Sequence, residues 1–97
     1  MPTYKAPVSD TVFLLSDVFD YAKYANSPGF SEAPIDVVEA VLSEGAKFVE
    51  EVVQPLNRIG DIEGCKLVDG HVITPTGFKG AWTKLYEAGW KAIAVPP

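Results

Sequence analysis

The chain has 97 residues, of which 47% are hydrophobic and 22% are charged, a composition that indicates one folded domain rather than a disordered chain. Eight basic residues against thirteen acidic ones give a formal net charge of −5. The basic residues are scattered, whereas binding to nucleic acids or anionic membranes depends on clustered Lys and Arg, so composition and charge argue against both kinds of partner.

The beginning of the chain is predicted to be an extended arm followed by a helix. Residues 1–9 contain two prolines and no apolar periodicity. Ser9 and Asp10 can each cap a helix with a side-chain oxygen. Apolar residues then recur at helical spacing until the loop sequence Asn-Ser-Pro-Gly, which starts at Asn26. We therefore expect a first helix over 10–25.

The most regular pattern follows. An apolar seam recurs at alternating steps of three and four residues, which predicts a long amphipathic helix: Ile35, Val38, Leu42, Gly45, Val49, Val52 and Leu56. Pro34 suits the first helical position. Pro55 removes a backbone hydrogen bond late in the helix, while the pattern continues beyond it. We expect a helix over 34–59 that is kinked at Pro55, and a close helix–helix approach at Gly45.

The last third of the chain changes pattern. Asp69-Gly70 between two short apolar pairs predicts a β-hairpin over 66–74. Thr74 or Thr76 is expected to cap a third helix over 76–88, which Gly89 closes in a left-handed conformation. An open apolar tail follows over 90–97. The predicted fold is mainly α: a single domain over 1–97, built as a three-helix up-and-down module with a short hairpin between the second and third helices.

Few residues suggest chemistry. His71 is expected to be a solvent-facing turn residue, and Cys65 a small, semi-buried side chain that has no partner for an intrachain disulfide. One His and one Cys do not form a metal site. Glu44 and Lys47 are three residues apart, as in an ordinary surface ion pair. The sequence therefore predicts no catalytic, cofactor-binding or metal-ligating residue.

The aromatic residues near the end of the chain are the strongest sign of an interaction. They recur at four-residue steps and exceed what a small module can bury by itself, so we expect an interface made by Phe78, Trp82, Tyr86 and Trp90. The alternative is an aromatic stripe that packs only into the core of the module. This face is also a candidate surface for a homo-oligomer. The chain lacks an apolar run of the ~20 residues needed to span a membrane and a signal-peptide pattern, which predicts a cytoplasmic protein.

Three segments, in order, match the pattern of one enzyme family: "MPTYKAPVSDTVFLLSDVFD", "FVEEVVQPLNRIGDIEGC" and "GFKGAWTKLYEAGWKAIAVPP". The family that they resemble is the FAD-dependent acyl-CoA dehydrogenases. The first segment is similar to an N-terminal extension found in one branch of this family. The second is similar to the long second helix of the family's N-terminal helical domain, and the third to the end of that domain. The extension often carries basic residues where this chain has Ser9 and Val12, which is a departure from the family pattern.

The resemblance implies an N-terminal fragment of an oxidoreductase of fatty acid metabolism. Such flavoproteins desaturate acyl-CoA thioesters between the α and β carbons, with a glutamate as base, FAD as hydride acceptor and an electron-transfer flavoprotein as electron acceptor. The catalytic groups lie in downstream β and C-terminal helical domains, which are missing here. The implied role is scaffold and acyl-site wall, with FAD bound only by the full-length enzyme and no activity in this chain alone. The alternative is a freestanding small helical protein-interaction module without enzymatic activity.

Overall fold

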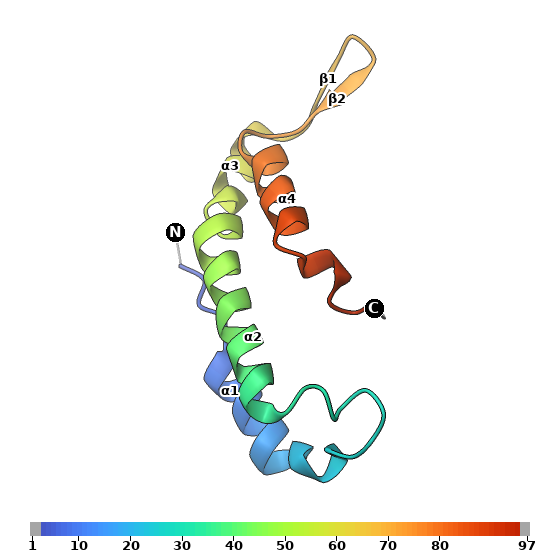
Figure 1. The fold of residues 1–97 in the computed structure, drawn as a ribbon. Coiled ribbons are helices and arrows are strands. Elements are labelled where there is room, and N and C mark those ends of the chain that lie inside the picture. Colours follow the sequence, from blue (N-terminus) through green and yellow to red (C-terminus); the bar gives the residue numbers. More distant parts are fainter. Residues whose placement is uncertain (1–2, 96–97) are drawn as a thin grey trace. The chain divides into compact units, whose positions relative to one another are not determined.

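The computed structural model describes residues 3–95 (Figure 1). The chain divides into two compact units, residues 1–51 and 52–97. Within the described range it forms four α-helices, short π- and 3-10-helical turns, and one two-stranded antiparallel sheet. The prediction of a mainly helical chain with a short hairpin is therefore confirmed. The outermost parts of the predicted arm and tail, residues 1–2 and 96–97, lie outside the described residues.

The first unit starts with short helical pieces instead of one helix. Residues 3–7 have no regular secondary structure. Helix α1 (Val8–Phe13) then continues as a π-helical turn at Leu14–Val18, and a 3-10 helix follows at Tyr21–Tyr24. Asp20 separates the last two with a φ of 49°. Aspartate adopts this left-handed conformation more readily than most residues. The expected uninterrupted helix over 10–25 is wrong, because the helix starts at Val8 and the backbone breaks at Asp20.

The predicted side-chain cap of this first helix is also wrong. Pro7 occupies the cap position, and no side chain makes a capping hydrogen bond there. The Pro7 carbonyl instead accepts hydrogen bonds from the Thr11 amide at 3.0 Å and from the Thr11 hydroxyl at 2.8 Å. Since proline has no N–H to satisfy, it fits at a helix start. Asp10 lies in the first turn, where its charge complements the helix dipole.

An aromatic cluster holds the loop between α1 and the next long helix. The Phe30 ring lies 5.8 Å from the Tyr21 ring and 5.6 Å from the Tyr24 ring, centroid to centroid. The Tyr21 hydroxyl donates a hydrogen bond to the Ala33 carbonyl, twelve residues away. These contacts tie the predicted Asn-Ser-Pro-Gly loop back onto the 3-10 helix that precedes it.

The long amphipathic pattern begins as α2 (Ile35–Phe48). Pro34 has an extended backbone and occupies the cap position before the helix. The helix therefore begins at Ile35, one residue later than predicted. Every residue of the predicted seam is half-buried, from Ile35 to Leu56. Glu44 and Lys47 form the expected ion pair at 3.5 Å. A second ion pair at 3.4 Å joins Lys5 of the arm to Glu50. The close approach at Gly45 stays a prediction.

The predicted helix over 34–59 is divided around Pro55. After α2, a π-helical turn spans Val49–Val53, residues 54–55 form a turn, and α3 (Leu56–Glu63) begins immediately after Pro55. Proline cannot donate the hydrogen bond that would continue the first helix, but its fixed φ suits the start of a new one. Pro55 has a φ of −61°, so it starts α3, which runs to Glu63, four residues beyond the predicted end.

The second unit contains the predicted hairpin. Strands β1 (Lys66–Val68) and β2 (His71–Ile73) pair antiparallel, with Leu67 opposite Val72. Asp69 and Gly70 between them have φ values of 50° and 77°. Positive φ at both central residues defines the type I′ turn, whose twist matches that of a two-residue hairpin. The Asp-Gly signal is thus confirmed.

Helix α4 (Phe78–Glu87) begins differently from the prediction. Gly77 occupies the cap position with a φ of 89°, and no side chain caps the helix. The Phe78 amide donates to the Pro75 carbonyl at 3.2 Å, which makes residues 75–78 a turn with glycine at its positive-φ position. The turn displaces Thr76 from the cap, so the expected Thr74 or Thr76 cap is wrong. The helix ends as predicted at Gly89, with a φ of 81°, before a 3-10 helix at Trp90–Ala92.

Helices α3 and α4 approach closely at one glycine. A Cβ added at Gly60 would lie 2.7 Å from Cζ of the Phe78 ring. In contrast, a Cβ at Gly80 meets no atom within 4 Å. The ring of Phe78 thus packs on bare backbone that only glycine provides.

These two glycines provide a matched pair for a stability measurement. Gly80→Ala is expected to stabilise the second unit by about 0.5–1 kcal/mol through helix propensity. Gly60→Ala gains the same propensity but forces the Phe78 ring to move, so its unfolding free energy is expected to be about 1–3 kcal/mol below that of the Gly80→Ala variant. Urea unfolding followed by circular dichroism measures both. Equal stabilities would contradict the close packing of Phe78 on Gly60.

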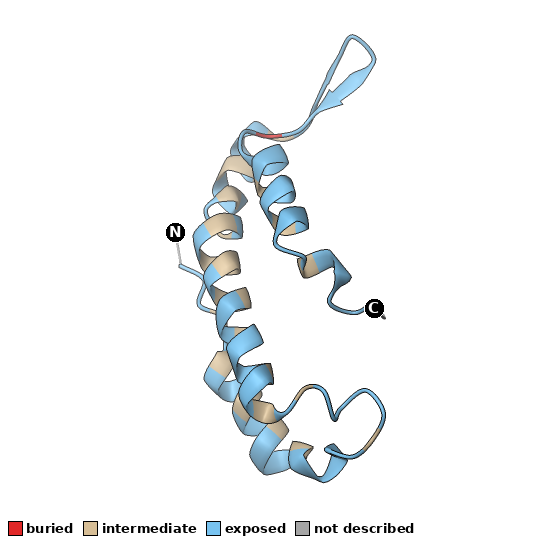
Figure 2. Ribbon diagram, viewed as in Figure 1, coloured by how far each residue is buried: buried red, intermediate tan, exposed pale blue. Residues whose placement is uncertain are grey.

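Burial is shallow in both units. Among the described residues, only Pro75 is buried, and no hydrophobic side chain is fully enclosed (Figure 2). A folded chain of this length normally removes roughly 60–70% of its unfolded surface from water. The apolar faces of the helices and of the hairpin are therefore only partly covered by the chain itself. None of the described helices has the length and apolar character needed to cross a membrane.

Candidate functional site

The aromatic residues expected to form an interface come from α4 and the turn that follows it. We define the aromatic face as Phe78, Trp82 and Tyr86 of α4 together with Trp90. Residues four apart lie on one side of a helix, so the first three form a stripe. Phe78 is 36% exposed, Trp82 55% and Tyr86 67%, while Trp90 is half-buried. The exposure of these large side chains makes α4 a candidate surface of the second unit.

A cation lies on this aromatic face. The Lys91 ammonium nitrogen is 4.4 Å from the centroid of the Trp82 ring, a cation–π contact worth about 0.5–1 kcal/mol at an exposed site. The left-handed Gly89 ends α4 and turns the chain so that Lys91 reaches back to a ring nine residues earlier. The face thus combines apolar area with positive charge. Its role as an interface stays a prediction.

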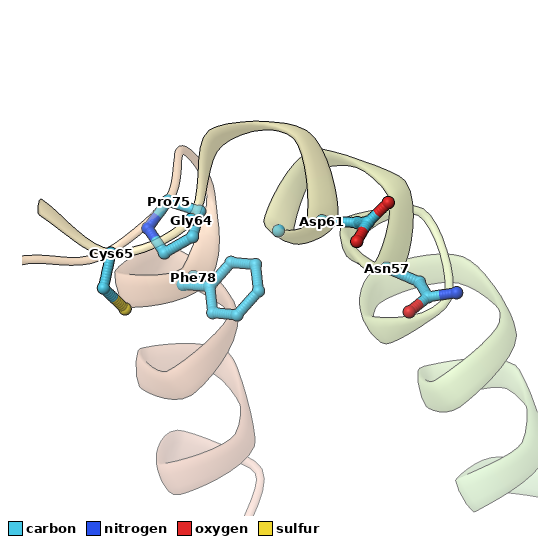
Figure 3. Close-up of a pocket in the computed structure, with 7 residues that line it drawn as sticks. Asn57, Asp61, Gly64, Cys65, Pro75 and Phe78 are labelled. Carbon is cyan, nitrogen blue, oxygen red and sulfur yellow. The ribbon is translucent and has the colours of Figure 1, made fainter.

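A second candidate site is an open pocket of about 400 Å³ in the same unit (Figure 3). Its walls come from α3, from the start of the hairpin and from the start of α4. It is lined by Asn57, Gly60, Asp61, Gly64, Cys65, Pro75 and Phe78. Figure 3 shows the Asn57 amide and the Asp61 carboxylate pointing away from the Phe78 ring. The polar groups therefore do not converge on one point, as they would around a bound substrate.

The lining of this pocket contains one carboxylate and no Lys or Arg. It therefore offers no basic side chain to pair with the pyrophosphate of FAD. Within residues 3–95, no group of three or more His, Cys, Asp and Glu side chains is placed to hold a metal ion.

Among the described residues, neither of the two residues with inherently reactive side chains, Cys65 and His71, takes part in a side-chain hydrogen bond or an ion pair. Cys65 is exposed, so the semi-buried position expected from the sequence is wrong. Cys65 lies between the end of α3 and the start of β1. His71 is exposed on β2, opposite Val68, in agreement with its expected position beside the turn. Nucleophilic catalysis needs a base within hydrogen-bond reach of the nucleophile, and within residues 3–95 no side chain is hydrogen-bonded to the Cys65 thiol.

One polar junction was not predicted. The Glu63 carboxylate accepts hydrogen bonds from the Thr76 hydroxyl at 2.8 Å and from the Thr76 amide at 3.2 Å. This junction closes the base of the hairpin by joining the end of α3 to the residue before Gly77. Thirteen residues separate the partners, and no local pattern in the sequence indicates that Thr76 turns toward Glu63 and away from its own helix.

Comparison with known proteins adds a relationship that the geometry alone does not give. No family model matches the sequence. The chain is 34% identical to the 3-methylmercaptopropionyl-CoA dehydrogenase of Ruegeria pomeroyi over 94 residues, which cover 97% of the chain. It is 32% identical to the butyryl-CoA dehydrogenase of Syntrophomonas wolfei over 90 residues, or 89% of the chain. It spans only 16% and 15% of the lengths of these two relatives. Over nearly its whole length, the chain is therefore related by sequence to the acyl-CoA dehydrogenases.

Proposed function

We propose that the chain is an amino-terminal segment of an acyl-CoA dehydrogenase, to which it contributes scaffold and part of the acyl-site wall. The observation that carries this proposal is the alignment of almost the whole chain with a small part of two much longer enzymes. The shallow burial supports it, because helices whose apolar faces are only half covered are suited to packing under further protein. In this proposal, Phe78, Trp82, Tyr86 and Trp90 form an interface with protein outside the module.

The proposed activity of the intact enzyme is the α,β-desaturation of an acyl-CoA thioester, with FAD as the hydride acceptor. The names of the two relatives share an acyl-CoA substrate and differ in the acyl group. The pocket of this chain offers no basic side chain for the pyrophosphate of FAD, and in this proposal the flavin and the catalytic base belong to other parts of the enzyme. The 97 residues alone are expected to bind no flavin and to turn over no substrate.

A chimera tests the proposal. The matched segment of the R. pomeroyi dehydrogenase is replaced by these 97 residues, and a version with the segment deleted serves as the control. We expect the chimera to purify with bound flavin and to oxidise its acyl-CoA substrate with an artificial electron acceptor, and the deletion protein to be inactive. The isolated chain is assayed in parallel with added FAD. Turnover by the isolated chain, or equal activity of the deletion protein and the chimera, would refute the scaffold role.

The alternative function is a freestanding interaction module. The observation that favours it is the exposure of Trp82 and Tyr86, which gives the second unit an available binding surface by itself. The nucleotide sequence that follows codon 97 distinguishes the two proposed functions. A reading frame that continues through a dehydrogenase after codon 97 supports the scaffold, and a stop codon there supports the module.

A further inference from the structure

One side of α4 combines its two most exposed aromatic residues with a lysine. Successive residues of an α-helix are about 100° apart around the helix axis. Trp82 and Tyr86 therefore lie within about 40° of each other, and Lys79 lies within about 60° of both. All three are exposed. Lys84, which is also exposed, falls on the opposite side of the helix. The charge of Lys79 thus belongs to the aromatic face, and that of Lys84 does not.

The border of the aromatic face is positive. The Lys91 ammonium nitrogen lies 4.4 Å from the centroid of the Trp82 ring. Among residues 3–95, neither Lys79 nor Lys91 forms an ion pair. Residues 76–95 contain three lysines and a single carboxylate, Glu87. Two positive charges beside the exposed rings therefore remain for a partner to neutralise.

The form of this surface favours a helix as its occupant. The stripe from Phe78 to Tyr86 is about 12 Å long at 1.5 Å per residue, which is about two turns of a helix. A row of side chains four residues apart is a ridge that fits a groove on another helix. An added β-strand would instead need a free strand edge, which the side of α4 does not provide. Amphipathic helices bind such surfaces through apolar residues at positions i, i+3, i+4 and i+7.

We propose that the aromatic face binds an acidic amphipathic helix from protein outside these 97 residues. The apolar side chains of that helix cover Trp82 and Tyr86, and its carboxylates pair with Lys79 and Lys91. Buried Trp and Tyr residues supply much of the binding energy of an interface, whereas the charges at its border select the partner. The inference rests on the proposed interface role of the aromatic face and gives the chemistry of its occupant.

Two synthetic helical peptides without aromatic residues test the proposal on the isolated chain. Both have the same leucine stripe, which is flanked by glutamates in one peptide and by lysines in the other. Both tryptophans of the chain lie in the second unit, so their emission reports binding there. The chain has a net charge of −5, and non-specific attraction would favour the lysine peptide. A preference for the glutamate peptide would therefore come from the local charges of the aromatic face.

The glutamate peptide is expected to shift the tryptophan emission to shorter wavelength and to bind about tenfold or more tightly than the lysine peptide. The difference should shrink at high salt, because salt screens exposed charges. Lys79→Glu is expected to weaken the glutamate peptide about three- to tenfold and to strengthen the lysine peptide. Lys84→Glu makes the same charge change on the opposite side of α4 and is the matched control. Circular dichroism checks that both variants keep their helix content.

Several results would overturn the proposal. One is an emission that neither peptide shifts, and another is a lysine peptide that binds as tightly as the glutamate peptide. A third is a control variant that weakens binding as much as Lys79→Glu, because the overall charge alone would then decide affinity. An active chimera whose isolated segment does not prefer the glutamate peptide would leave the scaffold role standing and remove only the acidic helix as occupant. An inactive chimera whose isolated segment binds that peptide would refute the scaffold role and keep the binding surface.

Discussion

Replacing Gly77 by alanine is expected to lower the unfolding free energy of the second unit by about 1.5–3.5 kcal/mol. Gly77 has a φ of 89°, a left-handed conformation in which a side chain costs about 1–2 kcal/mol. A Cβ there would also lie 2.8 Å from Cδ2 of Leu56. Leu56 must then leave its rotamer, which costs about 0.5–1.5 kcal/mol more. Both tryptophans of the chain lie in the second unit, so urea unfolding followed by tryptophan fluorescence reports on this unit.

Gly89 is the matched control for this substitution. It has a nearly equal φ of 81°, and a Cβ added to it meets no atom within 4 Å. Gly89→Ala therefore includes the conformational cost without the contact to Leu56. The Gly77 variant is expected to be the less stable of the two by about 0.5–1.5 kcal/mol. If the Gly89 variant proves equally or more damaging, Leu56 does not pack against the turn as the structure places it.

Features that depend on neighbouring residues were predictable from the sequence. The seam from Ile35 to Leu56 depends only on the 3.6-residue helical period, and every member of it is half-buried. The hairpin depends on Asp69 and Gly70, which adopt the positive φ values that a type I′ turn requires. The ion pair between Glu44 and Lys47 follows from their spacing. In each case, the feature depends only on residues that lie at most four positions apart in the sequence.

Features that depend on a choice between competing partners were not predictable. Thr76 has the side chain of a helix cap, but its hydroxyl bonds to Glu63 because Gly77 already occupies the cap position. Asp20 lies inside an apolar periodic pattern, yet its backbone is left-handed and the helix ends there. The packing of Phe78 on Gly60 joins residues on either side of a hairpin. Helical period and propensity contain no information on such distant partners.

The candidate site follows the same division. The four-residue spacing of Phe78, Trp82 and Tyr86 predicts a shared helix face, since this is a local property. The amount of that face that the rest of the chain covers is a property of the whole fold, and the structure leaves it largely open. The contact of Lys91 with Trp82 depends on the turn at Gly89, so the positive border of the face also required the structure.

The double substitution Trp82→Ala and Tyr86→Ala is expected to have opposite consequences in two settings. In the isolated chain, these side chains are 55% and 67% exposed, so their removal loses little packing. The unfolding free energy should change by less than about 1 kcal/mol, chiefly through the lost cation–π contact of Lys91. In the chimera with the R. pomeroyi dehydrogenase, the same side chains are proposed to lie under other protein. Truncating a buried aromatic anchor of an interface typically costs about 2–4 kcal/mol.

The measurement therefore compares two effects of the double substitution: the change in unfolding free energy of the isolated chain and the loss of flavin-containing chimera. Losing two anchors should reduce the fraction of chimera that assembles with flavin by about a hundredfold or more, since each 1.4 kcal/mol is a factor of ten. Leu67→Ala with Val72→Ala removes two apolar side chains of the same unit that are 75% and 66% exposed, and it controls for a general loss of apolar surface. Unfolding of the isolated chain by the aromatic substitutions would show that they belong to the chain's own core. A chimera that keeps full flavin content and activity would show that α4 faces solvent in the enzyme, and the proposed interface of the aromatic face would then be wrong.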